Sequence, residues 1–98
     1  MIYAVICTDK PDHLSMRMET RPTHLAWVDK LNADGILKIA GPFLDDEGKS
    51  CGSMLLIEAG SQADAEALAA EDPYARAGLF AKTEVRPFKW LYNNPEEA

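Results

Sequence analysis

Short apolar runs mark the places where the chain is expected to form strands. Residues 2–7 are apolar and rich in β-branched and aromatic types, and polar residues follow them, which predicts a buried central strand. Residues 36–43 and 53–59 predict two further strands, and the polar stretch 45–49 between them suits a hairpin turn. These two strands are therefore expected to be antiparallel neighbours.

A fourth strand is expected near the C-terminus, over residues 83–92. Its apolar and polar residues alternate, but the phase of the alternation slips around Pro87. Because proline cannot donate a ladder hydrogen bond, this strand is expected to lie at an edge of the sheet or to contain a bulge.

Residues 12–34 carry a helical pattern that Pro22 interrupts. Proline lacks the backbone N–H and pushes the preceding residue away from the α region, so two helical pieces are expected, the second beginning near Pro22 or Thr23. Gly35 is a natural stop for the second piece. Its side chains at spacings of three and four predict a stripe that faces the sheet: His24, Leu25, Val28 and Leu31.

A second helix is expected before the last strand. Ser61, with Asp64 three residues later, resembles a capping box and predicts the start of an alanine-rich helix that ends near Glu71. Asp72 stands directly before a proline, which predicts an N-cap for a short helical turn over residues 73–77.

The resulting order, β-α-β-β-α-β, is that of the ferredoxin-like α+β fold, a four-stranded antiparallel sheet with both helices on one face. The chain is interpreted as a single domain, residues 1–98, with a core over about 1–92 and a polar tail over 93–98. The strands also present apolar residues on the face without helices, and a chain this short buries a modest share of its surface. We therefore expect a homodimer formed through the sheet faces.

Charge and cysteine spacing exclude several classes of function. The chain has 10 Lys and Arg against 16 Asp and Glu, a net charge of -6, which disfavours nucleic acids and anionic membranes as partners. The longest apolar run, residues 2–7, falls far short of the ~20 residues of a membrane span, and no charged leader precedes it, so a cytoplasmic protein is expected.

Cys7 and Cys51 show no metal or redox spacing, and the acidic residues 45–47 match no calcium loop. Neither a metal nor a cofactor is expected.

His24 and Asp72 are the candidates for chemistry. An imidazole can move protons near neutral pH, and a helix N-terminus would keep the His24 ring neutral and ready as a base. The alternative is a histidine packed on an apolar stripe. Its role as a helix cap is sufficient to explain Asp72, and we expect the two roles to coexist only if one carboxylate oxygen caps while the other faces a cleft. Since both helices lie on one face of the sheet, we expect Asp72 to contact His24 and fix its tautomer.

Four segments occur together in an order and spacing that resemble the YciI-like, or YCII-related, family: Arg-Pro-Thr-His-Leu at 21–25, Ala-Gly-Pro at 40–42, Glu-Asp-Pro-Tyr at 71–74 and Val-Arg-Pro-Phe at 85–88. The resemblance covers residues 3–90. It implies a ferredoxin-like unit that pairs into a dimeric α/β barrel, similar to muconolactone isomerase. It also implies an active site made of a histidine at the start of a helix and an aspartate in the Asp-Pro-Tyr segment, here His24 and Asp72.

Five further residues are candidates for binding a substrate. Arg21 either binds an anionic group or is a solvated arginine, and Tyr74 either donates a hydrogen bond to a substrate or packs beneath the Asp-Pro turn. Ser53 resembles a pocket residue of the family, but no Gly-x-Ser-x-Gly elbow surrounds it, so it is not expected to be a nucleophile. Gly41 and Pro42 end a strand, and the family resemblance implies that they line a cleft.

The leading hypothesis is a cofactor-independent enzyme for a small organic molecule, in which the His/Asp pair supports proton abstraction, elimination or isomerisation. One branch of the family resembles a dehydrochlorinase that acts on a chlorinated hydroxyquinol. The alternative is a dimeric small-molecule-binding or accessory module without catalysis. A heme-free oxygenase ranks last, because no residue of the sequence selects oxygen chemistry.

Overall fold

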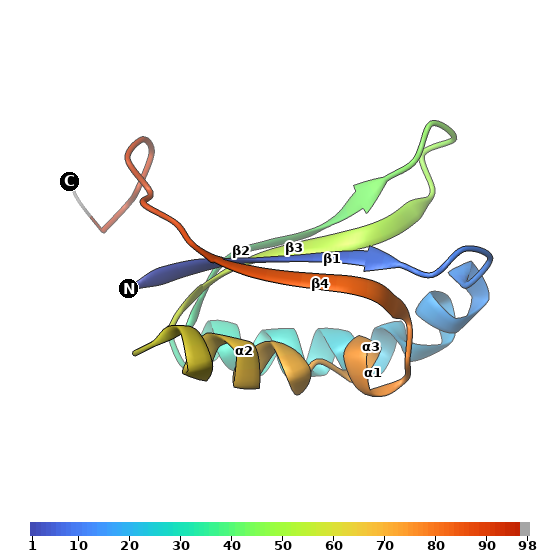
Figure 1. Ribbon diagram of the computed structural model, residues 1–98, viewed down its shortest axis with the longest axis horizontal. Coiled ribbons are helices and arrows are strands. Elements are labelled where there is room, and N and C mark those ends of the chain that lie inside the picture. Colours follow the sequence, from blue (N-terminus) through green and yellow to red (C-terminus); the bar gives the residue numbers. More distant parts are fainter. Residues whose placement is uncertain (97–98) are drawn as a thin grey trace.

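The computed structural model describes residues 1–96 and has the predicted ferredoxin-like α+β fold (Figure 1). Its elements follow in this order: β1 (Ile2–Asp9), α1 (Leu14–Ala33), β2 (Leu37–Leu44), β3 (Ser50–Glu58), α2 (Gln62–Ala70), α3 (Pro73–Arg76) and β4 (Phe80–Pro87). None of the described helices is both long enough and apolar enough to cross a membrane. The predicted order of strands and helices is confirmed.

The four strands form one antiparallel sheet in the order β2-β3-β1-β4. β1 is central, β2 and β3 are neighbours, and β4 lies at an edge, all as predicted. The predicted span of the last strand, 83–92, is wrong, because β4 begins at Phe80 and ends at Pro87. In the part of the chain that the structure describes, one further backbone hydrogen bond to the sheet follows, from Phe88 N to Ile2 O, and the chain then leaves the sheet. The irregularity of this strand pair lies at Thr8 and Asp9, at the other end of the ladder from Pro87.

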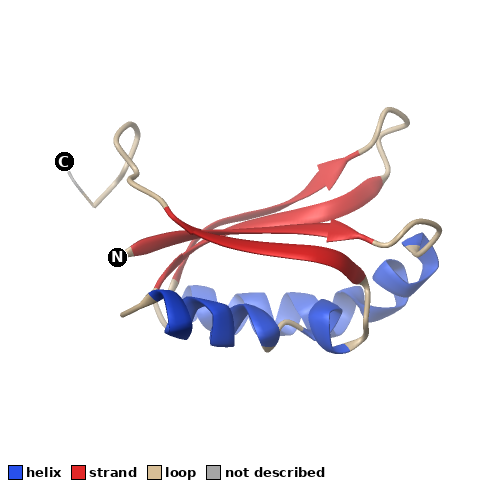
Figure 2. Cartoon of the chain, viewed as in Figure 1, coloured by secondary structure: helices blue, strands red, loops and turns tan. Residues whose placement is uncertain are grey.

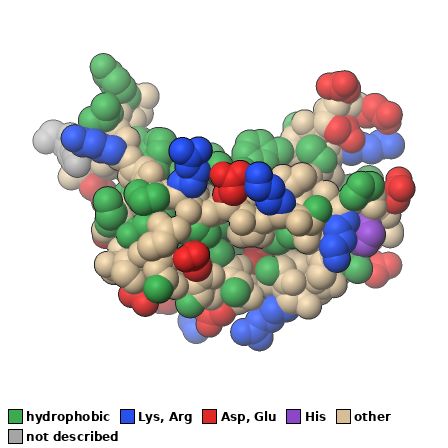
Figure 3. All heavy atoms as spheres, in the orientation of Figure 1, with side chains coloured by type: hydrophobic (Ala, Val, Ile, Leu, Met, Phe, Trp, Pro, Cys, Tyr) green, Lys and Arg blue, Asp and Glu red, His purple; other side chains and the backbone are tan. Residues whose placement is uncertain are grey.

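The edge strand β4 carries charged side chains on its solvent face. Lys82 and Glu84 form an ion pair at 3.0 Å, and Arg86 follows two residues later. Figure 3 shows basic and acidic side chains side by side across the middle of the visible face, where β4 runs. Charges of this kind discourage the unpaired strand edge from pairing with other chains.

Helix α1 is continuous through Pro22, so the prediction of two helical pieces is wrong. Proline removes one N–H from the hydrogen-bond ladder, but the packing of a 20-residue helix outweighs that local cost. The predicted stop is confirmed, since Gly35 has φ +74 and its N–H donates to Asn32 O. His24 therefore lies in the middle of a helix, and the helix N-terminus expected to influence its ring is nearly three turns away.

The two predicted caps of the second helical region are confirmed. Ser61 Oγ accepts a hydrogen bond from Asp64 N at 3.1 Å at the start of α2. Asp72 caps α3, where its Oδ1 accepts from Tyr74 N at 2.9 Å and Pro73 occupies the first turn.

Within residues 1–96, all three helices cover one face of the sheet, and the opposite face carries no helix (Figure 2). Between the two layers lies a core built mainly from alternate residues of β1 and β3 and from alanines of α2: Tyr3, Val5, Cys7, Leu55, Ile57, Ala65 and Ala69. Figure 1 shows the C-terminal segment rising beside one end of the open face and the β2–β3 hairpin rising beside the other. The open face is therefore concave.

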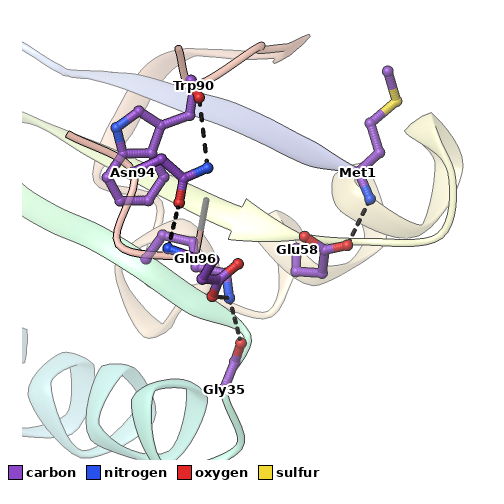
Figure 4. A network of polar contacts seen from close by, with 7 residues as sticks. Met1, Gly35, Glu58, Trp90, Asn94 and Glu96 are labelled. Atoms are coloured by element: carbon purple, nitrogen blue, oxygen red, sulfur yellow. Dashed lines mark hydrogen bonds and ion pairs between the residues drawn. The ribbon is translucent and has the colours of Figure 1, made fainter. Parts of the chain in front are cut away.

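The C-terminal segment is fastened by polar contacts near the start of β2 (Figure 4). Lys38 Nζ pairs with Glu96 and donates to Gly35 O at 3.1 Å. Glu96 N donates to Asn94 Oδ1 at 3.0 Å. Of the predicted polar tail, 93–98, residues 97 and 98 lie outside the described residues.

Candidate active site

His24 and Asp72 meet between the middle of α1 and the start of α3. His24 Nδ1 lies 2.8 Å from Asp72 Oδ1, and the side chains are 12% and 3% exposed. The expected contact is confirmed. The expected division of labour between the two carboxylate oxygens is wrong, because the same Oδ1 that contacts the imidazole also caps α3 by accepting from Tyr74 N.

The contact determines which imidazole nitrogen is available for chemistry. A carboxylate can only accept hydrogen bonds, so His24 Nδ1 carries the hydrogen and donates it to Asp72. In the neutral ring Nε2 then holds a lone pair. Nε2 has no hydrogen-bond partner among residues 1–96, and His24 lines a cavity. This is the arrangement that a general base requires.

Tyr74 fixes the plane of the His24 ring. The two rings stack with their centroids 3.9 Å apart and an interplanar angle of 17°. Tyr74 is itself buried and packs edge-on against Phe80. Burial raises the pKa of the Tyr74 phenol, and the nearby charge of Asp72 adds to that, against the lowering influence of Arg17 and Arg21. The phenol is therefore neutral at physiological pH.

Arg17 is a member of the site that the sequence analysis missed. Its guanidinium is buried, and it donates from Nε to Asp9 Oδ2 at 2.7 Å, from Nη2 to Asp9 Oδ1 at 2.9 Å and from Nη2 to Ser53 Oγ at 2.9 Å. Its Cζ lies 4.5 Å from the centroid of the Tyr74 ring. Burial works against the charge, but the hydrogen bond and charge of Asp9, with smaller contributions from Tyr74, outweigh it and hold the pKa of Arg17 above its ordinary value.

A cavity of about 450 Å³ lies between α1 and the β2–β3 strand pair. Six of the seven predicted site residues line it: Arg21, His24, Gly41, Pro42, Ser53 and Tyr74. Asp72 does not reach the wall and stands behind the imidazole. Arg17 also lines the cavity, and apolar side chains complete it, including Leu25, Val28 and Leu55. The cavity is thus largely apolar, and its ionisable groups are two arginines, one histidine and the phenol of Tyr74.

Ser53 serves this site as an anchor. It is buried on β3, and its hydroxyl accepts the hydrogen bond from Arg17 Nη2. The expectation that it is not a nucleophile remains a prediction. A wider hollow of about 780 Å³ on the other side of α1 contains none of the predicted site residues.

The two cysteines are free and stand outside the cavity wall. Burial raises the pKa of the Cys7 thiol to about 11, and Thr83 Oγ1 lies 3.8 Å from its sulfur. Cys51 is half-buried. Among residues 1–96, no three His, Cys, Asp or Glu side chains come together as a set of metal ligands.

Comparison with protein families gives a match over most of the chain. The model of the YCII-related domain matches residues 1–89. Protein YciI of Escherichia coli and protein YciI of Shigella flexneri are each 37% identical over 98 residues, which covers 94% of this chain and all of each relative. An uncharacterised protein of Haemophilus influenzae is 36% identical with the same coverage.

Two solved structures are similar to this chain. One is 5-chloro-2-hydroxyhydroquinone dehydrochlorinase from Burkholderia phenoliruptrix in complex with 2,5-dihydroxybenzoquinone, with a TM-score of 0.83, 31% identity and coverage of 96% of this chain and 99% of the other. The second is an antibiotic biosynthesis monooxygenase with a TM-score of 0.54, 13% identity and coverage of 93% and 99%. At that identity the monooxygenase shows a shared fold and nothing more.

Proposed function

The chain belongs to the YCII-related family, and from that premise we propose that it is an enzyme that moves a proton on a small organic molecule. His24 is the general base and Asp72 is its orienting partner. The observation that carries this proposal is the 2.8 Å contact from His24 Nδ1 to Asp72 Oδ1 in a histidine that also lines the cavity.

The roles of the two residues follow from their hydrogen bonds. Asp72 holds the hydrogen on Nδ1, so the lone pair of Nε2 accepts the proton of the substrate. When the imidazolium forms, the buried carboxylate compensates its charge. The stacked Tyr74 ring prevents the imidazole from turning away, which keeps Nε2 directed at one place in the cavity.

The substrate class that fits best is a small ring with ionisable hydroxyl groups. The cavity volume is within the ordinary range for a small-molecule site, and its apolar walls suit a flat ring. The similar dehydrochlorinase, whose structure contains 2,5-dihydroxybenzoquinone, supports this class. In an elimination, Nε2 takes a proton from the substrate and the leaving group departs with its bonding electron pair. The reaction so proposed uses side chains of the protein alone.

The test is chloride release from 5-chloro-2-hydroxyhydroquinone, followed by ion chromatography in the wild type and in His24→Gln. Loss of the base is expected to lower kcat/KM by at least about 100-fold. His13→Gln is the matched control, because His13 lies outside the cavity and, among the described residues, its side chain hydrogen-bonds to Pro11 O alone. It should turn over like the wild type.

Two results would contradict the proposal. Equal chloride release by the wild type and His24→Gln would remove His24 from the chemistry. If the wild type bound the chlorinated ring without releasing chloride, and His24→Gln bound it equally well, the alternative of a binding module would replace the enzyme.

A further inference from the structure

Arg17 has donor capacity that the protein does not use. A guanidinium carries five N–H donors, and the three on Nε and Nη2 are taken by Asp9 and Ser53. Asp9 and Ser53 leave the two on Nη1 free, and the hydroxyl of Tyr74, which also interacts with this guanidinium, can accept at most from one of them. At least one N–H of Arg17 is therefore not used by these partners. Because Arg17 lines the cavity, we infer that the remaining donor capacity serves that space.

The guanidinium is held rigidly by two strands and an aromatic ring. Asp9 at the end of β1 binds it through two parallel hydrogen bonds, and Ser53 on β3 adds a third. The Tyr74 ring lies against it at 4.5 Å. A guanidinium held in one orientation presents its remaining N–H groups in a fixed direction. This geometry favours binding of a planar oxygen anion whose orientation matches those donors.

A second arginine supplies positive charge that is not neutralised. Asp9 balances Arg17, and Asp72 stands behind His24, out of the cavity wall. Arg21 is exposed, lines the same cavity and forms no ion pair with any described residue. Arg17, Arg21 and His24 lie four and three residues apart on α1, so they share one face of the helix.

We propose that Arg17 Nη1, with Arg21 at the entrance, forms a subsite for an oxygen anion of the ligand, a phenolate, enolate or carboxylate attached to a small ring. This inference deepens the proposed function and rests on it for the location of the site. Its chemical consequence is that the site prefers a ring that carries a negative charge over a neutral ring of the same size. In the proposed reaction, the same donors would stabilise the oxyanion left when His24 removes a proton.

The test compares the binding of two ring probes by isothermal titration calorimetry at pH 7. One is 2,5-dihydroxybenzoquinone, which is anionic at this pH, and the other is hydroquinone, which is neutral. Arg17→Lys keeps the charge opposite Asp9 but loses the fork. It should weaken binding of the anionic quinone at least about tenfold and change hydroquinone binding less than about threefold.

A second variant covers the possibility that Arg17→Lys does not fold. Arg21→Gln changes an exposed side chain, so it should keep the wild-type melting temperature and still weaken binding of the anionic quinone about threefold or more. The proposal is overturned if Arg17→Lys, when folded, binds both probes like the wild type or loses both equally. It is also overturned if Arg21→Gln leaves anion binding unchanged.

Measuring Arg17→Lys again in the His24→Gln background separates the two proposals. The preference for the anionic probe, and its loss with Arg17, should persist there because binding needs no proton transfer. If turnover fails while this preference holds, the subsite stands without the proposed enzyme. If turnover holds while the preference is absent, only the subsite falls.

Discussion

One oxygen atom, Asp72 Oδ1, serves both the architecture and the proposed chemistry. It accepts from Tyr74 N at 2.9 Å, which caps α3, and from His24 Nδ1 at 2.8 Å, which fixes the imidazole. Tyr74 also stacks on that imidazole, so cap, base and stacking ring form one unit. Two substitutions of Asp72 can therefore distinguish the effect of its acceptor oxygen from the effect of its negative charge.

Asp72→Asn and Asp72→Ala are expected to differ. An amide oxygen in the place of Oδ1 can accept the same two hydrogen bonds, so Asp72→Asn should keep the cap and the tautomer and lose only the negative charge. We expect stability within about 0.5 kcal/mol of the wild type and kcat/KM at least about tenfold lower. Asp72→Ala loses the cap as well and should lower the free energy of unfolding by about 1–2 kcal/mol. Urea denaturation and chloride release measure the two effects.

The outcome that would contradict this division is an Asp72→Asn protein as unstable as Asp72→Ala. That result would mean that the carboxylate charge, rather than its oxygen as an acceptor, holds α3 in place.

The sequence predicted most of the candidate site but not its buried arginine. His24 and Asp72 were predicted because the resemblance to the YCII-related family points to them; their local patterns alone also fit a packed histidine and a helix cap. The role of Arg17 depends on Asp9 and Ser53, eight and 36 residues away along the chain, and no local pattern shows that partnership. The spacing of Arg17 and Arg21 before His24 was the available signal, since it places all three on one helix face.

At the scale of the elements, the error at Pro22 has a physical cause. Proline in a helix interior costs about 3 kcal/mol locally, which is why a break was expected. The packing of α1 against the rest of the molecule cannot be read from a local pattern. This packing stabilises α1 as one continuous helix across Pro22. The strands and caps were predicted more closely because their signals depend on neighbouring residues in the sequence. These signals are the hydrophobic runs of the strands and the capping residues Ser61, Asp72 and Gly35.

The approach of β1 to β3 leaves no room for a side chain at Gly52. A Cβ on Gly52 would lie 2.4 Å from Cys7 O, a backbone atom that cannot move without the strand. Gly52→Ala should therefore lower the free energy of unfolding by about 1–3 kcal/mol and displace the neighbouring Ser53 from Arg17. Gly41→Ala is the control for stability, because nothing lies within 4 Å of a Cβ there, and its effect should stay within about 0.5 kcal/mol. Urea denaturation of both variants measures their free energies of unfolding. Equal values for Gly52→Ala and Gly41→Ala would contradict the prediction and show that β1 and β3 separate at little energetic cost.

At the scale of the whole molecule, the helix-free face of the sheet has no covering layer within residues 1–96. A hollow of about 700 Å³ lies on it, lined by β1–β3 residues and by the segment 86–92. Ile39 and Phe88 at this hollow are more than 40% exposed, although both are large and apolar. Exposed apolar surface of this kind in a small domain is typical of an interface. The homodimer expected from the sequence is therefore proposed here, with the open faces of two sheets packed on each other.

The dimer has a direct test by light scattering coupled to size exclusion, where the expected mass is twice the 10.8 kDa of one chain. Ile6 is half-buried, on the open face, and pairs with Met54 across β1 and β3. Its other cross-strand neighbour is Glu84 on β4, so Ile6→Lys would add a second charged side chain beside an existing one on the open face. Burying these charged groups in an otherwise apolar interface is costly, so the change should shift the protein to the mass of a single chain. Ala67→Lys makes the same kind of change at an exposed position of α2 and should leave the mass at the dimer value. If Ala67→Lys dissociates the protein and Ile6→Lys does not, the interface lies on the helix layer. The cavity beside α1 would then lie close to the partner, and its arginines would have to be considered as contacts between chains as well as contacts to a ligand.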